Sequence, residues 1–373
     1  MTVFLDVSQL VHDPARTGIQ RAERELIRHW PGPAPLVPCR LDPGRGGFRL
    51  LPESLLAALT EDAPPGGIEA ERELIAPHLR AGPPLPAGAR LLCAELFGDP
   101  ARAEAYCTLA NGVQAAWLVY DFLPWLYPDW FGPGGARSLM PYLRALRAVP
   151  RTAFISAQTR AEYARVMRRG ASEEGLGPVV PLGGDGFALE RQRFSPARRG
   201  FVFIGTLEPR KNAALVLRAF ERLWREEDAD ARLTVIGRPA PDGRAERELI
   251  ERLADEPRLR VLGRVPDAAV RTALRGARAL LFPSEGEGFG IPPLEALHAG
   301  IPAVIAASLP AAAGLPPLGQ LRLDPVTDDT VLAAVRRLLD DAEAERLWAE
   351  AAALLVPTWR DFAEAVAAWA QAA

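Results

Sequence analysis

Residues 283–302 read Pro-Ser-Glu-Gly-Glu-Gly-Phe-Gly-Ile-Pro-Pro-Leu-Glu-Ala-Leu-His-Ala-Gly-Ile-Pro and follow an apolar run that ends at Phe282. The closely spaced Gly286, Gly288 and Gly290 disfavour regular structure and predict a loop whose backbone can approach a ligand. The prolines behind them favour a helix start, because proline at the first helical position loses no hydrogen bond. We therefore predict a strand, a glycine loop and a helix, an arrangement that binds ligands beyond the carboxyl ends of parallel strands.

Two carboxylates lie in this stretch, Glu287 in the predicted loop and Glu295 in the predicted first turn of the helix. A carboxylate accepts hydrogen bonds from vicinal hydroxyls, while loop amides and a helix N-terminus favour a diphosphate. Hydroxyls joined to a diphosphate describe a nucleotide sugar. Taken singly, Glu295 would only complement the helix dipole and Glu287 would be a solvated loop residue; the whole stretch favours the ligand site.

A second motif lies at residues 205–212, which read Gly-Thr-Leu-Glu-Pro-Arg-Lys-Asn and predict a turn before a helix capped by Asn212. It places Arg210 and Lys211, the only lysine of the chain, just ahead of that helix. Breaking a glycosyl donor leaves a nucleoside diphosphate, so cations here would stabilise the charge that develops in the transition state. An ordinary surface pair of basic residues is the alternative.

Short apolar runs alternate with helical patterns along the chain, which is typical of parallel sheets covered by helices. The length of 373 residues is enough for two domains. The arginine-rich stretch 190–200 is predicted to be the linker. The predicted strands are Val3–Val7, Arg90–Glu95, Ala115–Tyr120, Thr152–Ser156 and Val179–Leu182 in one sheet, and Phe201–Gly205, Leu233–Gly237, Leu259–Gly263, Ala279–Phe282 and Ala303–Ala306 in the other.

The segment Glu287-Gly-Phe-Gly-Ile-Pro-Pro-Leu-Glu295 resembles the E-x7-E motif of retaining glycosyltransferases of family 4. The resemblance implies that Glu287 contacts the transferred sugar, Glu295 the ribose and Lys211 the phosphates. Many relatives carry a further arginine where this chain has Thr206, which leaves the second phosphate cation open. The donor-binding residues implied are Gly18, Thr206, Arg210, Lys211, Gly237, Arg264, Val265, Glu287, Gly288, Phe289, Gly290, Ile291 and Glu295.

The same family has the α/β GT-B fold, in which two Rossmann-like parallel-sheet domains face a cleft and the C-terminal helix crosses back to the first domain. The resemblance implies an acceptor-binding domain at residues 1–187, completed by residues 358–373, and a donor-binding domain at residues 188–357. Gly18, ahead of a predicted helix, resembles the glycine loop that reaches the donor from the first domain, although an ordinary strand-to-helix turn would look similar.

Candidate acceptor contacts follow two strands of the first domain. Tyr120 and Asp121 stand where relatives have a His-Asp pair, so Asp121 would orient or deprotonate an acceptor hydroxyl with Tyr120 in place of the histidine. His12 would touch substrate or be solvated. The aromatic side chains of residues 122–131 would stack on sugar rings, rest on lipid headgroups or fill the core.

Composition excludes several classes of protein. The formal net charge of −3 offers no basic field for nucleic acid. No apolar run approaches the roughly 20 residues of a membrane-spanning helix, and no leader is evident, which predicts a cytoplasmic protein with at most peripheral contact at the inner membrane face. The three widely spaced cysteines suggest no zinc site. No metal or cofactor is expected, since Lys211 and a helix N-terminus can neutralise the diphosphate.

The predicted function is retaining transfer of a hexose or deoxyhexose to a glycan or lipid-linked glycan in surface polysaccharide synthesis, with GDP-mannose as the first donor and UDP- or dTDP-sugars still open. Glu287, Lys211, Arg210 and Asp121 are the predicted catalytic residues. A GT-B nucleotide-sugar epimerase and a catalytically silent nucleotide-sugar-binding subunit are the alternatives.

Overall fold

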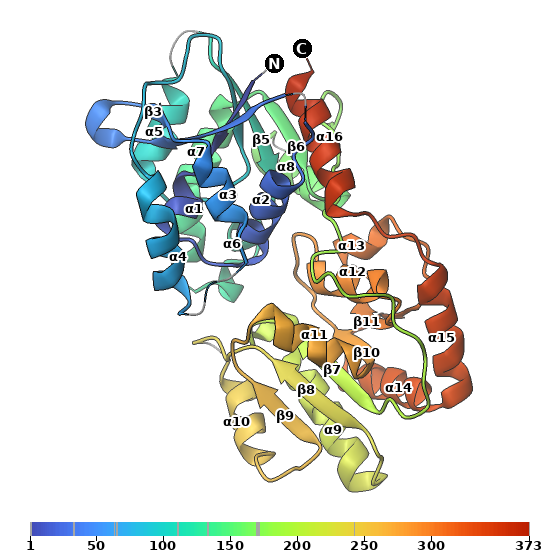
Figure 1. The fold of residues 1–373 in the computed structure, drawn as a ribbon. Coiled ribbons are helices and arrows are strands. Elements are labelled where there is room, and N and C mark those ends of the chain that lie inside the picture. Colours follow the sequence, from blue (N-terminus) through green and yellow to red (C-terminus); the bar gives the residue numbers. More distant parts are fainter. Residues whose placement is uncertain are drawn as a thin grey trace. The chain divides into compact units, whose positions relative to one another are not determined.

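The computed structural model describes residues 2–372 except 33, 63, 65, 110, 111, 133, 169–171 and 242. The chain forms two compact units. Unit 1 comprises Met1–Leu182 with Thr358–Ala373, and unit 2 comprises Gly183–Pro357. Each unit has a six-stranded sheet with helices around it (Figure 1). The expected architecture of two parallel-sheet domains is therefore confirmed.

The sheet of unit 1 is parallel except for its first edge strand, which pairs antiparallel with its neighbour. Its strands lie in the order β3-β2-β1-β4-β5-β6. The strands are β1 (Val3–Asp6), β2 (Leu36–Leu41), β3 (Phe48–Leu50), β4 (Arg90–Cys93), β5 (Gln114–Val119) and β6 (Arg151–Phe154). The helices are α1 (Ser8–His12), α2 (Gly18–Arg28), α3 (Ser54–Thr60), α4 (Ile68–Ile75), α5 (Pro100–Cys107), α6 (Leu123–Leu126), α7 (Gly135–Ala148), α8 (Ala157–Met167) and α16 (Trp359–Gln371).

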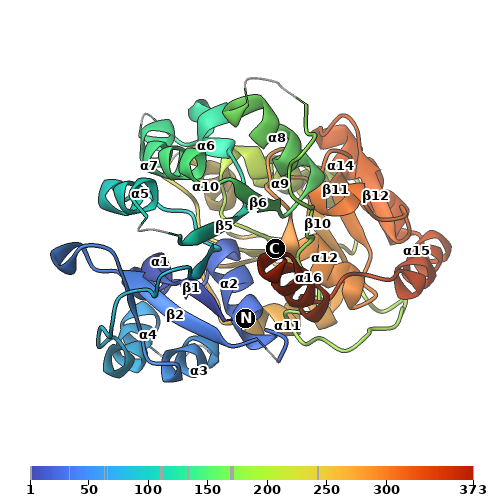
Figure 2. The same ribbon diagram turned by 90° about the horizontal axis from the view of Figure 1, so that it is seen from above.

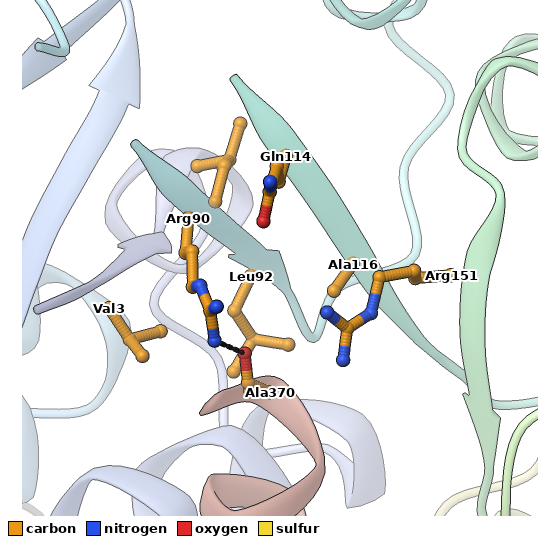
Figure 3. Close-up of a pocket in the computed structure, with 8 residues that line it drawn as sticks. Val3, Arg90, Leu92, Gln114, Ala116, Arg151 and Ala370 are labelled. Atoms are coloured by element: carbon orange, nitrogen blue, oxygen red, sulfur yellow. Dashed lines mark hydrogen bonds between the residues drawn. The ribbon is translucent and has the colours of Figure 1, made fainter. Parts of the chain in front are cut away.

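The C-terminal helix α16 returns to unit 1, as expected, and contacts α2 and β4 (Figure 2). Two arginines from the amino ends of strands hold its C-terminus. Arg151 donates to the carbonyls of Trp369 at 2.7 Å and Ala372 at 2.8 Å, and Arg90 donates to that of Ala370 at 3.4 Å. A cation is favourable at a helix C-terminus, where carbonyls carry partial negative charge. The cavity beside these arginines, about 10 Å³, has room for a water molecule rather than a substrate (Figure 3).

A buried charge cluster occupies the carboxyl ends of β1 and β4. The guanidinium of Arg102 on α5 bonds to Asp6 at 2.5 Å and to Glu95, and both carboxylates are buried. Tyr106 donates to Asp6 at 2.7 Å. Glu23 on α2 is also fully buried nearby, and burial followed by the charge of Glu95 raises its pKa well above the ordinary value. Asp6 and Glu95 therefore share the close cation of Arg102 inside unit 1.

Unit 2 has an all-parallel sheet in the order β12-β11-β10-β7-β8-β9. Because β7 and β10 are central neighbours, the segments that follow them meet at one edge of the sheet. The strands are β7 (Gly200–Ile204), β8 (Arg232–Ile236), β9 (Leu259–Leu262), β10 (Ala277–Phe282), β11 (Ala303–Ala306) and β12 (Gln320–Leu323). The helices are α9 (Ala213–Glu226), α10 (Arg244–Arg252), α11 (Asp267–Arg275), α12 (Ile291–His298), α13 (Pro310–Ala313), α14 (Asp328–Leu339) and α15 (Asp341–Ala353).

Nine of the ten predicted strands are present, with ends shifted by at most two residues. The predicted strand Val179–Leu182 is wrong: prolines at positions 178 and 181 lack the N–H of a ladder, and only a single parallel bridge joins Val179 to Phe154. The prediction also missed β2, β3 and β12. The predicted linker 190–200 belongs to unit 2, where the amide of Gln192 donates to Ala299 at 2.8 Å; the chain first passes between units at Leu182.

Candidate donor site

Glycines let the ends of β7 and β8 approach each other closely. Gly237 has φ 149°, and a Cβ there would lie 1.8 Å from the carbonyl oxygen of Gly205. Gly205 has φ 153°, and a Cβ there would lie 3.0 Å from Cδ of Lys211. The positive φ favours glycine at both positions, and at Gly237 the backbone contact also leaves no room for a Cβ.

A 3₁₀ turn, Pro209–Lys211, carries the two predicted phosphate cations between β7 and α9. Asn212 follows in the left-handed conformation, with φ 58°. It stands at the N-cap position, but its side chain makes no capping hydrogen bond. Its amide instead donates to the carbonyl of Pro283 at 2.9 Å and to Glu285 at 3.0 Å. The predicted capping role is therefore wrong, and the side chain ties this turn to the glycine loop after β10.

The predicted catalytic residues Lys211, Arg210 and Glu287 meet in one cluster. The ammonium of Lys211 and the hydroxyl of Ser284 each donate to Oε1 of Glu287 at 2.7 Å. Nη1 of Arg210 lies 3.5 Å from the same oxygen. The three ionised side chains are 12% to 13% exposed, which makes their mutual attraction stronger than that of a surface pair. Residues 76 positions apart in sequence are thus brought together.

Glu208 completes this cluster, since its carboxylate lies 2.6 Å from Nη2 of Arg210. Glu208 and Ser284 were not among the predicted site residues. Each lies inside one of the two motifs, but neither residue type by itself indicates a binding role. The available signal was the spacing, since Glu208 precedes Arg210 by two positions in a predicted tight turn.

The loop after β10 leads directly into α12. Gly290 has φ 102°, and a Cβ there would lie 2.7 Å from Cδ1 of Leu309, so only glycine fits. Gly288, Phe289 and Ile291 are buried, and the carbonyl of Phe289 accepts from the amide of Ala311 at 2.9 Å. These contacts fix the course of the loop backbone.

Glu295 is 3% exposed and lies in the second turn of α12, not in the first turn as predicted, because the helix starts at Ile291. The dipole explanation for its presence is therefore weakened, since that effect fades after the first turn. His298, one turn further on, has a lowered pKa because burial disfavours its charged form.

The remaining predicted donor contacts of unit 2 lie at the carboxyl ends of neighbouring strands. Thr206 follows β7, Gly237 follows β8, and Arg264 and Val265 follow β9. Thr206 and Arg264 are exposed, and Val265 is partly exposed. The sheet edge therefore lines up these backbones with the cluster around Glu287. Among the described residues, no group of three or more His, Cys, Asp or Glu is placed to hold a metal ion.

The predicted residues of unit 1 follow β1 and β5. Gly18 is the exposed first residue of α2, and His12 is the exposed last residue of α1. Asp121 follows β5 and accepts from the amide of Leu123 at 3.1 Å. Tyr120 is 2% exposed, and burial raises the pKa of its hydroxyl, so it packs in the core instead of standing open to solvent.

The aromatic side chains of residues 122–131 divide between core and surface. Phe122 is fully buried, whereas Trp125 and Tyr127 are 40% and 39% exposed. The ring of Tyr127 stacks on Trp130 with centroids 4.2 Å apart. Core packing therefore accounts for Phe122, and contact of the exposed members with sugar rings or lipid headgroups stays a prediction. Among the described residues, no helix is long and apolar enough to cross a membrane.

Comparison with known proteins places the chain beside glycosyltransferases. Residues 189–354 match the family model described as glycosyl transferases group 1. The serotype-specific mannosyltransferase WbdA of Escherichia coli is 29% identical over 332 residues, which cover 81% of this chain and 38% of WbdA. The O-antigen chain mannosyltransferase B of Escherichia coli is 35% identical over 153 residues, which cover 40% of this chain and 39% of that protein. This chain thus spans about two fifths or less of the length of these relatives.

Solved structures resemble the whole chain in fold. HepE of Anabaena, crystallised with UDP-glucose, has a TM-score of 0.65 at 14% identity, covering 99% of this chain and 98% of that one. Sucrose-phosphate synthase of Thermosynechococcus elongatus has a TM-score of 0.63 at 17% identity, covering 98% and 97%. Residues 189–354 are thus similar to the glycosyl transferases group 1 family, and the two parallel-sheet units of the chain have the GT-B fold.

Proposed function

We propose that the chain is a retaining glycosyltransferase of polysaccharide synthesis that transfers mannose from GDP-mannose to a glycan or lipid-linked glycan. The similarity to two mannosyltransferases supports the sugar. The observation that carries the proposal is the cluster of Lys211, Arg210 and Glu287 at the carboxyl ends of β7 and β10. Two cations beside a carboxylate and a glycine loop suit a diphosphate joined to a hydroxyl-rich sugar.

In the proposed reaction the donor diphosphate takes the place of Glu287 at Lys211 and Arg210, and Glu287 turns to the hydroxyls of the sugar. The acceptor oxygen forms its bond to the anomeric carbon on the face from which the diphosphate leaves. The bond from that carbon to the phosphate oxygen breaks, and the acceptor proton passes to the departing phosphate. The two cations stabilise the charge that builds on the phosphate, so we propose that no metal is needed.

The acceptor contacts predicted in unit 1, Asp121, Tyr120 and His12, remain predictions. Burial of Tyr120 favours a supporting role for it and leaves Asp121 as the stronger candidate for contact with an acceptor hydroxyl. The following experiment distinguishes the proposal from the alternative donors, UDP- and dTDP-sugars, and from the alternative functions, an epimerase and a silent binding subunit.

A panel of GDP-mannose, UDP-glucose and dTDP-rhamnose should give nucleotide release from GDP-mannose that depends on an added mannoside. Glu295→Ala should weaken GDP binding by about tenfold or more, because a hydrogen bond to a charged group contributes about 1.5 to 3 kcal/mol. Calorimetric titration with GDP measures the change. Glu246→Ala is the matched control, since Glu246 is an equally buried glutamate on α10 of the same unit.

Isomerised GDP-mannose without acceptor would support the epimerase, and GDP binding without turnover would support the silent subunit. Release from UDP-glucose alone would contradict the proposed donor. Equal affinity of the Glu295→Ala variant and wild type for GDP would contradict the ribose contact.

We also propose peripheral contact of unit 1 with an anionic membrane. Trp125, Tyr127 and Met140 are exposed on the packed helices α6 and α7 and the turn between them, and Arg137 and Arg147 are exposed along α7. Aromatic rings favour the headgroup layer, and exposed arginines favour acidic lipids.

The double variant Trp125→Ser, Tyr127→Ser should lose most of its co-sedimentation with phosphatidylglycerol vesicles, while phosphatidylcholine vesicles retain little of either protein. Leu355→Ser is the control, because Leu355 is 85% exposed in unit 2. Undiminished binding of the double variant would show that this surface does not meet the membrane.

A further inference from the structure

Arg210 is held from two sides. Its Nη2 lies 2.6 Å from Glu208 within the same turn, and its Nη1 donates to the carbonyl of Gly286 in the loop after β10. Both Arg210 and Glu208 are mostly buried, at 12% and 15% exposed. The guanidinium thus bridges the two motifs that the proposed function assigns to the donor.

The backbone that carries this pair is also fixed. The carbonyl of Arg210 accepts from the amide of Glu285 at 3.0 Å, and the carbonyl of Glu208 accepts from the amide of Lys211 at 3.0 Å. Pro209 stands between the two charged residues and restricts φ. Because the backbone of this turn is fixed, the direction of the Arg210 side chain depends on the groups that its Nη1 and Nη2 atoms contact.

We propose that Glu208 is a positioning residue that aims Arg210 at the donor diphosphate, so that Arg210 supplies the second phosphate cation in place of the residue at position 206. This inference rests on the proposed function. Thr206 is exposed and carries no charge, so it cannot fill that role itself. Arg210 stands beside Lys211, on a turn that is tied to the glycine loop.

Glu208 also gives Arg210 a carboxylate partner of its own, so that Glu287 is paired mainly with Lys211. Arg210 lies 2.6 Å from Glu208 and 3.5 Å from Glu287, whereas Lys211 lies 2.7 Å from Glu287. If Glu208 lost its charge, Arg210 would be drawn toward Glu287, and two cations would then hold the carboxylate that must turn to the sugar. Positioning for the transition state would suffer, while the attraction of the site for a phosphate would not.

The experiment is a double-mutant cycle of Glu208→Gln and Arg210→Ala, read by GDP release from GDP-mannose and by calorimetric GDP binding. Glu208→Gln should lower kcat about tenfold without weakening GDP binding. The double variant should be no slower than Arg210→Ala, because Glu208 acts through that residue. Glu221→Gln is the control, since it removes a carboxylate 11% exposed and 2.5 Å from Arg252 elsewhere in unit 2.

Losses in kcat that add in the double variant, or a wild-type kcat in Glu208→Gln, would overturn the positioning role while leaving the proposed function intact. Weakened GDP binding in Glu208→Gln would also overturn it, because a carboxylate that only tied the turn together would act in that way. A wild-type protein that binds neither GDP nor UDP would instead overturn the proposed function and this inference together.

Discussion

Lys211→Ala is expected to lower kcat for sugar transfer about 10²-fold, the scale found when one preorganised contact to developing charge is removed. The reason is that the ammonium, 13% exposed and held 2.7 Å from Glu287, stands ready to receive the charge of the departing diphosphate. Because the contact strengthens as charge builds up on the departing diphosphate, kcat should fall by more than KM rises. Steady-state kinetics with GDP-mannose measures both.

Lys211→Arg is the matched variant, because it keeps the charge but replaces a compact ammonium with a planar fork. It should recover part of the lost rate. A Lys211→Ala protein that folds normally and transfers sugar at the wild-type rate would remove Lys211 from the reaction.

Arg102→Met is expected to lower the free energy of unfolding of unit 1 by about 3 to 5 kcal/mol, the usual cost of removing one partner of a buried ion pair. Arg102 is 2% exposed and bonds to Asp6 and Glu95, so its loss leaves buried carboxylates without their close cation. Urea unfolding followed by tryptophan fluorescence measures the change. Arg144→Met is the control, because Arg144 pairs with Glu104 on the surface of the same unit.

The loss of unfolding free energy in Arg102→Met should depend on pH. Burial raises the pKa of Glu95 from 4.5 to about 7, against the opposing charge of Arg102. Between these values the folded chain keeps a proton that the unfolded chain has released, so stability falls as pH rises through this window. Without Arg102 the pKa rises further, and the deficit of Arg102→Met should be larger near pH 8 than near pH 5. A deficit that is the same at both pH values would contradict this electrostatic explanation.

Motifs confined to short segments could be predicted well. The glycine loop, its helix and the turn with Arg210 and Lys211 follow from residue types with narrow backbone preferences, and the structure places them at neighbouring strand ends. Strands without such strong local signals were harder to predict. The short strand β3 and the proline-containing β2 have weak local signals, and pairing with β1 makes β2 a strand.

Residue patterns were enough to predict the α/β class, the alternation that gives two parallel sheets, and the charged residues beside the glycine loop, because local backbone preferences and apolar periodicity act over a few residues. The folded chain was needed to show that Glu208 joins Arg210, that Ser284 joins Glu287, that Asn212 ties two loops instead of capping a helix, and that Arg102 pairs with buried carboxylates. Those contacts join side chains from segments far apart in sequence, or depend on how a turn directs its side chains, and neither is encoded by local pattern.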